Sequence, residues 1–302
     1  MQIVDIEHAD IAKKTALALG YFDTFHLGHQ MLLSAVSASG YVPAMFTFEG
    51  DFYGALGLET LPIYTWESRM HYAEKYGVRY VVSMRADRAH LGLSPKAFFA
   101  LLMRANPALI VCGEDFRFGK NAVAGIEELQ SYCAAHGVAF RAFPLLKDHG
   151  GLKIGTFGIR KALEAGDMQK VSAYLGRTYT LVGTVTHGRA DGAKLGFPTA
   201  NFPLNPYCQT PAMGVYLAGV YVIDRWYLAV CNVGTHPTLG DMSVNVECYL
   251  LHYQGDLYGQ EIKVRLHARL RDIRTFATKE ELAAQIEKDC QEAERMMGGV
   301  YD

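Results

Sequence analysis

The chain has 302 residues, half of them apolar, so it can fold into one large domain or two ordinary domains with separate cores. Its 29 basic and 31 acidic side chains nearly cancel, which argues against a nucleic-acid partner but allows a local anion pocket. The cysteines are scattered and show no Cys-x-x-Cys spacing, and the sequence has neither a secretory signal nor an apolar run long enough to span a bilayer. These features predict a cytoplasmic protein without a membrane partner.

Short apolar runs alternate with helical segments in the first half of the chain. Strands are predicted at residues 15–19, 42–48, 78–83, 108–112 and 138–143, and helices at 27–37, 65–76, 95–104 and 125–135. This alternation predicts an α/β fold, a Rossmann-like parallel sheet covered by helices. Ligands of such sheets bind at the carboxyl ends of the strands, so the loops that follow the strands are the first candidates for a site.

The pattern changes near residue 180. Short β-rich runs at 179–185, 214–223, 226–230, 244–251 and 261–270, separated by turns, predict an antiparallel barrel or sandwich. The segment 159–175 has a helical pattern and is expected to bridge the two parts. A terminal helix is predicted over 279–296, with Thr278 as its expected cap. We therefore predict two domains, residues 1–178 and 179–302.

A polar cluster, GYFDTFHLGH at residues 20–29, follows the first strand and opens the first helix. The helix N-terminus favours phosphate, and His26 and His29 are spaced so that both rings can face the same side. Two imidazoles there can stabilise charge on a transferred nucleotidyl group, which makes them candidate catalytic residues. Taken singly, each histidine could be a surface or capping residue, and zinc would need further ligands. The candidate nucleotide contacts of this loop are Phe22, Asp23 and Gly28, the last leaving room beside the backbone.

Residues 20–29 resemble the His-x-Gly-His signature of nucleotidyltransferases and, more narrowly, the N-terminal module of the bacterial bifunctional riboflavin kinase/FAD synthetases. The sequence GEDFRFGK at residues 113–120 matches a second landmark of that family. Its carboxylate, guanidinium and aromatic rings suit a nucleotide and a flavin, although a plain turn with both rings in the core is the alternative. The candidates are Gly113, Asp115 and Arg117 for ATP, and Phe116 and Phe118 for the flavin.

Several positions depart from the family pattern. Tyr21 and Thr24 stand where the family has Asn and Gly, and EGDF at 49–52 replaces a continuation to a His-Pro pair. The sequence GTFGIR at 155–160 aligns with the family's Ser-Ser-Thr-Arg-Ile-Arg, so the inner arginine is Gly158 here. Such an arginine commonly contributes a factor of about 10³ to phosphoryl chemistry. Thr156 and Arg160 remain as candidate phosphate contacts, and Lys153 or Arg117 are candidates to supply the missing charge.

The sequence GTVTHGRADGAKLGFPTAN at residues 183–201 carries the best-kept landmark of the second half. Its glycines let backbone amides approach a phosphate, and Pro198 rigidifies a turn that presents Thr199 and Asn201. The hydroxyl of Thr199 and the carbonyl of Asn201 are hard oxygens suited to Mg²⁺. Gly183, Gly188, Lys194 and Gly196 are the other candidate ATP contacts. This segment, with further landmarks at 214–216, 232–238 and 246–251, resembles the riboflavin kinase signature.

The resemblance implies roles for two charged residues. Glu247, the lone charge in the apolar run 246–251, corresponds to the general base that accepts the proton of the riboflavin 5′-hydroxyl. An edge-strand glutamate facing water is the alternative. Arg271 corresponds to a segment near the flavin, or forms a solvated surface pair.

The resemblance spans about residues 15–290 and implies an enzyme that uses ATP and Mg²⁺ to convert riboflavin to FMN, and then adenylylates FMN to FAD. A monofunctional riboflavin kinase with a degenerate N-terminal module is the first alternative. A flavin- or nucleotide-sensing regulatory protein is the second. The intact Thr199, Asn201 and Glu247 argue against the second, and the altered residues 155–158 separate the other two. The resemblance predicts no particular oligomeric state.

Overall fold

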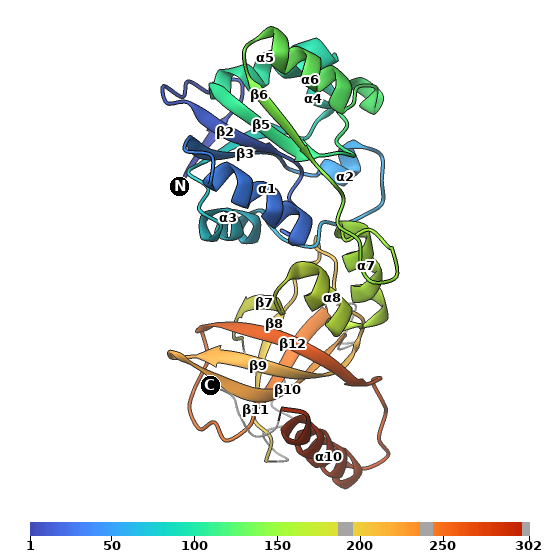
Figure 1. Ribbon diagram of the computed structural model, residues 1–302. Helices are drawn as coiled ribbons and strands as arrows, with labels where there is room; N and C mark the ends of the chain where they lie inside the picture. The colour runs from blue at the N-terminus through green and yellow to red at the C-terminus, as the bar shows by residue number, and fades with distance from the viewer. Residues whose placement is uncertain (187–195, 236–243, 298–302) are drawn as a thin grey trace. The chain divides into compact units, whose positions relative to one another are not determined.

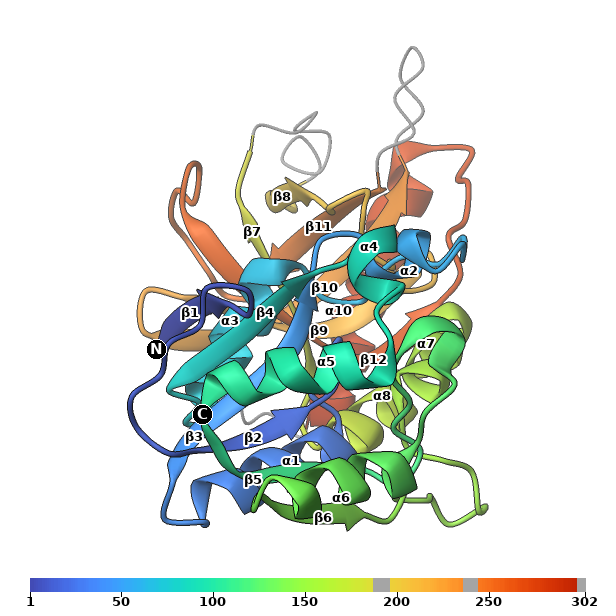
Figure 2. The same ribbon diagram turned by 90° about the horizontal axis from the view of Figure 1, so that it is seen from above.

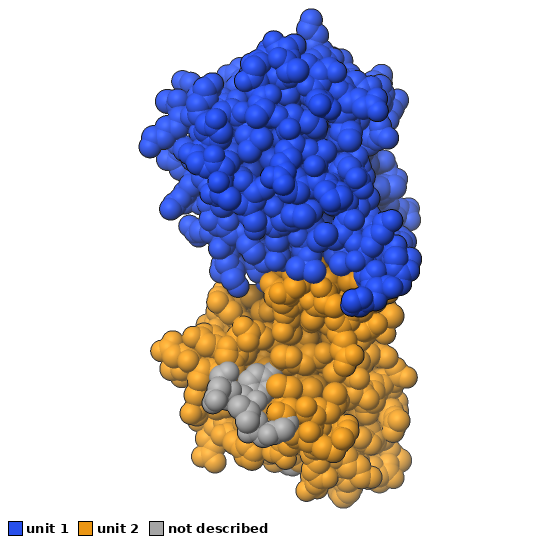
Figure 3. All heavy atoms as spheres, in the orientation of Figure 1, with its two compact units in different colours: residues 1–158 blue, residues 159–302 orange. Residues whose placement is uncertain are grey.

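A computed structural model describes residues 1–186, 196–235 and 244–297 of the chain (Figure 1). The chain divides into two units, Met1–Gly158 and Ile159–Asp302, coloured separately in Figure 3. No helix among the described residues combines the length and the apolar character needed to cross a bilayer.

The N-terminal unit is built on a six-stranded sheet in which every pairing is parallel. From edge to edge the order is β1, β4, β3, β2, β5 and β6 (Figure 2). The strands are β1 (Gln2–Asp5), β2 (Thr15–Leu19), β3 (Val42–Glu49), β4 (Tyr80–Arg85), β5 (Pro107–Gly113) and β6 (Ala139–Phe143).

Helices cover both faces of this sheet, α1 (Leu27–Ser37) and α3 (Trp66–Lys75) one face, and α5 (Pro95–Leu102) and α6 (Ile126–Ala135) the other (Figure 1). The central strand β2 is buried throughout. Its alanines pack with α1 and α3, and its leucines with α5 and α6. A strand buried on both faces carries mostly apolar side chains, which explains the run ALAL, and the hydroxyl of Thr15 before it donates to the Ala105 carbonyl. The predicted α/β class is confirmed.

Strand β2 also marks a reversal in the strand order. It pairs with β3, which follows it in the chain, and with β5, which the chain reaches only after β4. The chain therefore leaves β2 toward α1 on one face and leaves β5 toward α6 on the other. The crevice between such diverging loops is where open α/β sheets bind ligands. Both predicted motifs of this unit, residues 20–29 and 113–120, begin there.

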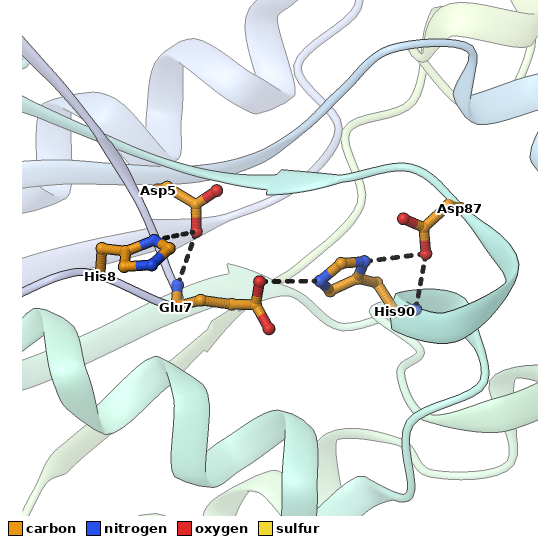
Figure 4. A network of polar contacts seen from close by, with 5 residues as sticks. All are labelled: Asp5, Glu7, His8, Asp87 and His90. Carbon is orange, nitrogen blue, oxygen red and sulfur yellow. Dashed lines mark hydrogen bonds and ion pairs between the residues drawn. The ribbon is translucent and has the colours of Figure 1, made fainter.

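Strand β1, which the sequence pattern did not predict, pairs in parallel with β4 at the sheet edge, and the turn that follows it contacts the short helix α4 (Arg88–Leu91) (Figure 4). The ring of His90 lies 2.8 Å from Asp87 Oδ1 and 3.6 Å from Glu7 Oε2. Asp87 caps α4 by accepting from the backbone N–H of His90, and these bonds lower the pKa of its carboxyl. Other short elements missed from the sequence are α2 (Phe52–Ala55), η1 (Met103–Ala105) and η2 (Lys120–Ala122).

The segment 159–175 is helical as predicted, but it consists of two helices, α7 (Thr156–Ala165) and α8 (Met168–Leu175). Gly166 has a φ of +73°, a left-handed conformation that ends α7 at little steric cost. The Asp167 side chain then accepts from the N–H of Lys170 at 2.9 Å and starts α8.

The C-terminal unit is a six-stranded antiparallel sheet in the order β7, β12, β9, β10, β11 and β8. The sheet curls until its two ends meet, because Thr186, just past β7, donates its N–H to the Asn201 carbonyl of β8 at 2.8 Å. The predicted antiparallel barrel is confirmed. Its strands are β7 (Tyr179–Thr184), β8 (Thr199–Pro203), β9 (Gly214–Val222), β10 (Arg225–Thr235), β11 (Val244–Leu250) and β12 (Glu261–Arg271).

The terminal helix α10 (Lys279–Met297) covers part of one face of this sheet, where Ala293 packs against Val215 and Val230. Thr278 caps it as predicted, accepting from the N–H of Glu281 at 3.2 Å. The opposite face forms the barrel interior, which includes the buried ring of Phe202.

Gly183 in β7 has a structural reason to lack a side chain. A Cβ atom there would lie 2.0 Å from Cδ2 of Phe202, whose ring is fully buried. The sequence proposed Gly183 as an ATP contact, and the packing of Phe202 explains the glycine without one.

We predict that Gly183→Ala lowers the unfolding free energy of the C-terminal unit by about 1–3 kcal/mol, because the ring of Phe202 must shift in a packed core. Urea unfolding of the variant measures this. Thr184→Ala, at the exposed neighbouring position of β7, serves as the control and should unfold like the parent protein. Equal stability of the alanine variant and the parent would contradict the packing argument.

Candidate active sites

The loop between β2 and α1 has a strained backbone. Phe22 and Phe25 have φ values of +53° and +50°, although non-glycine residues seldom adopt positive φ. Both rings are fully buried in the core beneath α1. Burying two large aromatic rings offsets the strain, and strained backbone of this kind clusters at functional sites.

The two histidines of the loop lie together. Their rings stack with centroids 3.8 Å apart, and His26 caps α1 by accepting from the His29 N–H at Nδ1, 3.3 Å away. Because Nδ1 is an acceptor, the neutral His26 ring carries its proton on Nε2. The structure therefore brings the two predicted catalytic rings side by side at the start of a helix.

Gly28 is needed by the histidine pair. A Cβ atom at this position would lie 3.0 Å from Cε1 and 3.1 Å from Nδ1 of His26. The space that the sequence assigned to a nucleotide is therefore taken by the capping imidazole. A side chain at residue 28 would push that ring away from His29.

Asp23 has a different use from the predicted phosphate contact. Its carboxylate is 1% exposed and accepts hydrogen bonds from the N–H groups of Ile63 at 2.9 Å and Tyr64 at 3.2 Å. The hydroxyl of Tyr53 donates to it at 3.1 Å. Asp23 thus joins both ends of segment 53–64 to the histidine loop. Burial raises the pKa of its carboxyl above the ordinary 3.8, despite these hydrogen bonds.

The second predicted loop begins at the end of β5, next to the histidine loop through the β2–β5 pairing. Asp115 forms an ion pair with Lys153, and both side chains are about half exposed. Lys153, one of the two cations expected to replace the missing arginine, thus neutralises the carboxylate predicted to bind ATP. Arg117, the other cation, is exposed.

The two aromatic residues of this loop differ in exposure. Phe118 is 5% exposed inside the core beneath α5 and packs on Phe98. Phe116 is half-buried, with its ring 6.0 Å from that of Phe118. Of the two, Phe116 keeps more surface for a ligand. Gly113 precedes the loop at the end of β5, where a Cβ atom would lie 2.9 Å from Oδ1 of Asp115.

Helix α7 carries the two surviving residues of the altered segment 155–160. The Thr156 hydroxyl lies 3.4 Å from that of Thr24, so the structure joins this segment to the histidine loop, 132 residues away in sequence. Arg160 is 8% exposed and donates to Gln209 Oε1 at 2.9 Å in the C-terminal unit.

The second candidate site is a row of polar side chains across three strands of the barrel. Glu247 on β11 is the direct partner of Asn201 on β8 and of Asn232 on β10. Directly opposed residues of antiparallel strands share a face, with Cα atoms about 4.5–5.5 Å apart. The carboxylate and the two amides therefore lie on one face, and Glu247 is half-buried between the neighbours.

The side-chain amide of Asn201 is fixed by Thr199. Its Nδ2 donates to the carbonyl and hydroxyl oxygens of Thr199 at 3.0 and 3.1 Å, which fixes the amide. Its Oδ1 is buried and has no hydrogen-bond partner among the residues that the structure describes. A buried carbonyl oxygen without a donor is costly unless a ligand satisfies it. Both residues lie on β8 rather than on the predicted turn.

A cleft of about 200 Å³ adjoins Thr199. Its walls are formed by Val185, Pro198, Leu250 and the connection between β11 and β12, which includes Leu257 and Tyr258. The cleft is smaller than a typical pocket for a whole drug-sized ligand.

Four other contacts were predicted in the C-terminal unit, and the structure describes two of them, Arg271 and Gly196. Arg271 is bound to the buried Asp289 of α10 through Nε and Nη2, at 3.0 and 2.7 Å, so its guanidinium holds the helix on the sheet. Gly196 has a φ of +87°, which requires glycine. Gly188 and Lys194 lie outside the described residues.

The sequence reasoning missed three residues of these sites, Arg69, Thr47 and Asn232. Arg69 and Thr47 are buried beside the histidine loop, and nothing in a helical or strand pattern marks them. Asn232 stands in a segment that resembles the riboflavin kinase signature, and this was the available signal.

Comparison with known proteins matches both units. Residues 8–155 match the FAD synthetase family and residues 175–297 the riboflavin kinase family. The chain is 32% identical to the Bacillus subtilis bifunctional riboflavin kinase/FMN adenylyltransferase, over 93% of this chain and 92% of that protein. It is 31% identical to the Escherichia coli K12 protein of the same name, over 90% of each.

A solved structure has the same architecture over nearly the whole chain. A crystal structure named as a macrolide-efflux protein from Streptococcus pneumoniae superposes with a TM-score of 0.87 and 26% identity, covering 96% of this chain and 97% of that one. The family matches leave residues 156–174 between them, so the boundary at 178 stays a prediction.

We predict that Asp23→Asn removes a pH dependence of the N-terminal unit. With the folded pKa raised, the unfolded chain loses the proton first, so stability falls as pH rises above 3.8 toward the folded pKa. The variant keeps the shape but cannot ionise, and its stability should fall less over this range. Thermal unfolding at a series of pH values tests this, and parallel curves for the two proteins would contradict it.

Proposed function

Because the chain belongs to the family of bifunctional riboflavin kinase/FMN adenylyltransferases, we propose that it phosphorylates riboflavin with ATP and then adenylylates the FMN product to FAD. The observation that carries the kinase activity is the row of Asn201, Glu247 and Asn232 on one face of the barrel. The observation that carries the adenylyl transfer is the stacked pair of His26 and His29 at the N-terminus of α1.

In the kinase site, Glu247 acts as the general base. Its carboxylate takes the proton of the riboflavin 5′-hydroxyl while that oxygen attacks the γ-phosphorus of ATP, and ADP leaves. Cross-strand pairing supports this role, because it holds the carboxylate about one strand spacing from Asn201. Asn232 on the other side can donate to the carboxylate or to the flavin tail.

The residues of β8 fit Mg²⁺. The buried Asn201 Oδ1 and the Thr199 hydroxyl are hard oxygen donors on neighbouring positions, and the amide is already oriented by Thr199. Bound there, Mg²⁺ would neutralise charge that develops on the ATP phosphates. The cleft beside Thr199 then takes the base of ATP, between apolar walls and the Tyr258 ring.

In the adenylyl site, the phosphate of FMN attacks the α-phosphorus of a second ATP, and pyrophosphate leaves. His26 donates from Nε2 to a phosphate oxygen, since its Nδ1 accepts from the His29 N–H. Thr156, held beside Thr24, adds a hydroxyl from α7. Lys153 beside Asp115 supports the view that a cation still stands near the nucleotide, in place of the arginine lost at Gly158.

The first test is to incubate the protein with riboflavin, ATP and Mg²⁺ and to separate FMN from FAD. Formation of both supports the proposal, and FMN alone would favour a kinase with an inactive N-terminal module. If neither FMN nor FAD forms, a sensing role is favoured.

We predict that Glu247→Gln lowers kcat for FMN formation by about 10²–10⁴-fold, because the amide cannot accept the proton. Its KM values should change little, and FAD formation from added FMN should persist. Glu261→Gln, an exposed glutamate of β12, is the control. Near-parental FMN formation by the Glu247 variant would refute the base role.

We predict that Asn201→Ala raises the Mg²⁺ concentration needed for half-maximal FMN formation, roughly tenfold for each 1.4 kcal/mol of lost binding. A Mg²⁺ titration measures this, with Asn205→Ala, at an exposed position after β8, as the control. An unchanged Mg²⁺ requirement would remove Asn201 from the metal site.

A further inference from the structure

Arg69 of α3 is a buried cation that none of the predicted motifs includes. Its side chain is 3% exposed, and burial lowers the pKa of its guanidinium below the usual range. No carboxylate lies within ion-pairing distance of it in the described parts of the chain. Burying a guanidinium costs free energy unless its N–H groups find hydrogen-bond acceptors. The acceptors around Arg69 therefore indicate which segments it holds together.

Those partners tie two strand ends together. Nη2 of Arg69 donates to the Tyr21 carbonyl at 2.6 Å and to the Phe48 carbonyl at 3.1 Å. It also donates to the hydroxyl of Thr47, which in turn donates to the Tyr21 carbonyl at 2.7 Å. Tyr21 opens the histidine loop after β2, whereas Thr47 and Phe48 belong to β3. The guanidinium and the hydroxyl therefore fasten the start of the loop to the end of β3.

Aromatic rings shield this contact from water. The Arg69 guanidinium lies 4.4 Å from the ring centroid of Tyr21 and 5.3 Å from that of Trp66. Phe52 stacks on Tyr21 at 4.3 Å, and Phe48 on Phe52 at 4.7 Å. Tyr21 and Phe52 are both positions where the chain departs from the family pattern, and the structure places them in contact. Excluding water strengthens each polar interaction that the rings cover.

The residue after Tyr21 is the strained Phe22, and His26 follows four residues later. A loop with positive φ at two non-glycine residues keeps its shape only when its surroundings fix it. Arg69 fixes its first carbonyl, and the stacked histidines lie at its other end.

We propose that Arg69 is a positioning residue for adenylyl transfer, which clamps the histidine loop to β3 and thereby sets where the His26 and His29 rings stand relative to the reacting phosphate. This inference rests on the proposed adenylyl activity. Arg69 itself is buried against the Tyr21 and Trp66 rings, so we assign it a positioning role and not a contact with the substrate. Its effect should therefore appear in the rate of the chemical step more than in ATP binding.

The test compares Arg69→Met, Arg69→Lys and Thr47→Val with the parent protein. Misplacing catalytic groups by about 1 Å can cost on the order of 10²-fold in rate, and we expect that loss in kcat for FAD formation by Arg69→Met. The KM for ATP should stay within about threefold, since the interaction lost is made in the transition state. The lysine variant, which keeps charge and a donor, should recover part of the rate.

Two controls separate positioning from folding. FMN formation from riboflavin, measured in the same samples, should be unchanged because it uses the barrel. Arg79→Met removes an exposed arginine of the same unit and should leave both activities unchanged. If Arg69→Met does not fold, Thr47→Val serves instead, because it keeps the shape of the side chain and removes only the bridging hydroxyl.

Parental kcat for FAD formation in the folded Arg69 variants and in Thr47→Val would overturn the inference. A loss that matches only the fraction of unfolded N-terminal unit, measured by thermal unfolding, would also overturn it. Parent protein that forms FMN but no FAD would instead refute the proposed adenylyl activity, and the two failures are therefore distinct.

Discussion

Hydrogen bonding between neighbouring strands is the interaction on which both candidate sites depend. In the N-terminal unit, the β2–β5 pairing sets two loops side by side that are about ninety residues apart in the chain. In the barrel, β11 pairs with β8 and β10, and so places Glu247 between Asn201 and Asn232. Register decides this completely, since a slip of one residue would send Glu247 to the barrel interior.

Polar side chains buried around the histidine loop hold it in place. Asp23 and Arg69 are ionisable side chains, both almost fully buried, and each contacts backbone groups of other segments. Asp23 holds segment 53–64, and Arg69 holds the end of β3. The loop is therefore fixed from two directions, which accounts for the survival of positive φ at Phe22 and Phe25.

Several positions at which the chain departs from the family pattern contact one another in the structure. Tyr21 and Phe52 differ from the family separately in the sequence, yet their rings stack and cover the same guanidinium. Thr24 lies beside Thr156. The substitution at Gly158 has no such compensation in its own helix, because Arg160 turns to Gln209. Lys153, the cation that we assign to the place of that arginine, lies outside α7 and pairs with Asp115.

The sequence by itself determined the two-part organisation, most strands and helices, the family, and the motifs that bear the chemistry. Those features depend on local pattern and residue type, which the chain carries directly. Only the tertiary structure decided that Asp23 is buried against segment 53–64, that Gly28 lies against the His26 ring and that Phe118 lies in the core. It also decided that Arg69 and Thr47 are buried beside the histidine loop and that Asn232 shares a face with Glu247. These depend on contacts between segments far apart in the chain, and strand register and burial fix such contacts without leaving a local pattern.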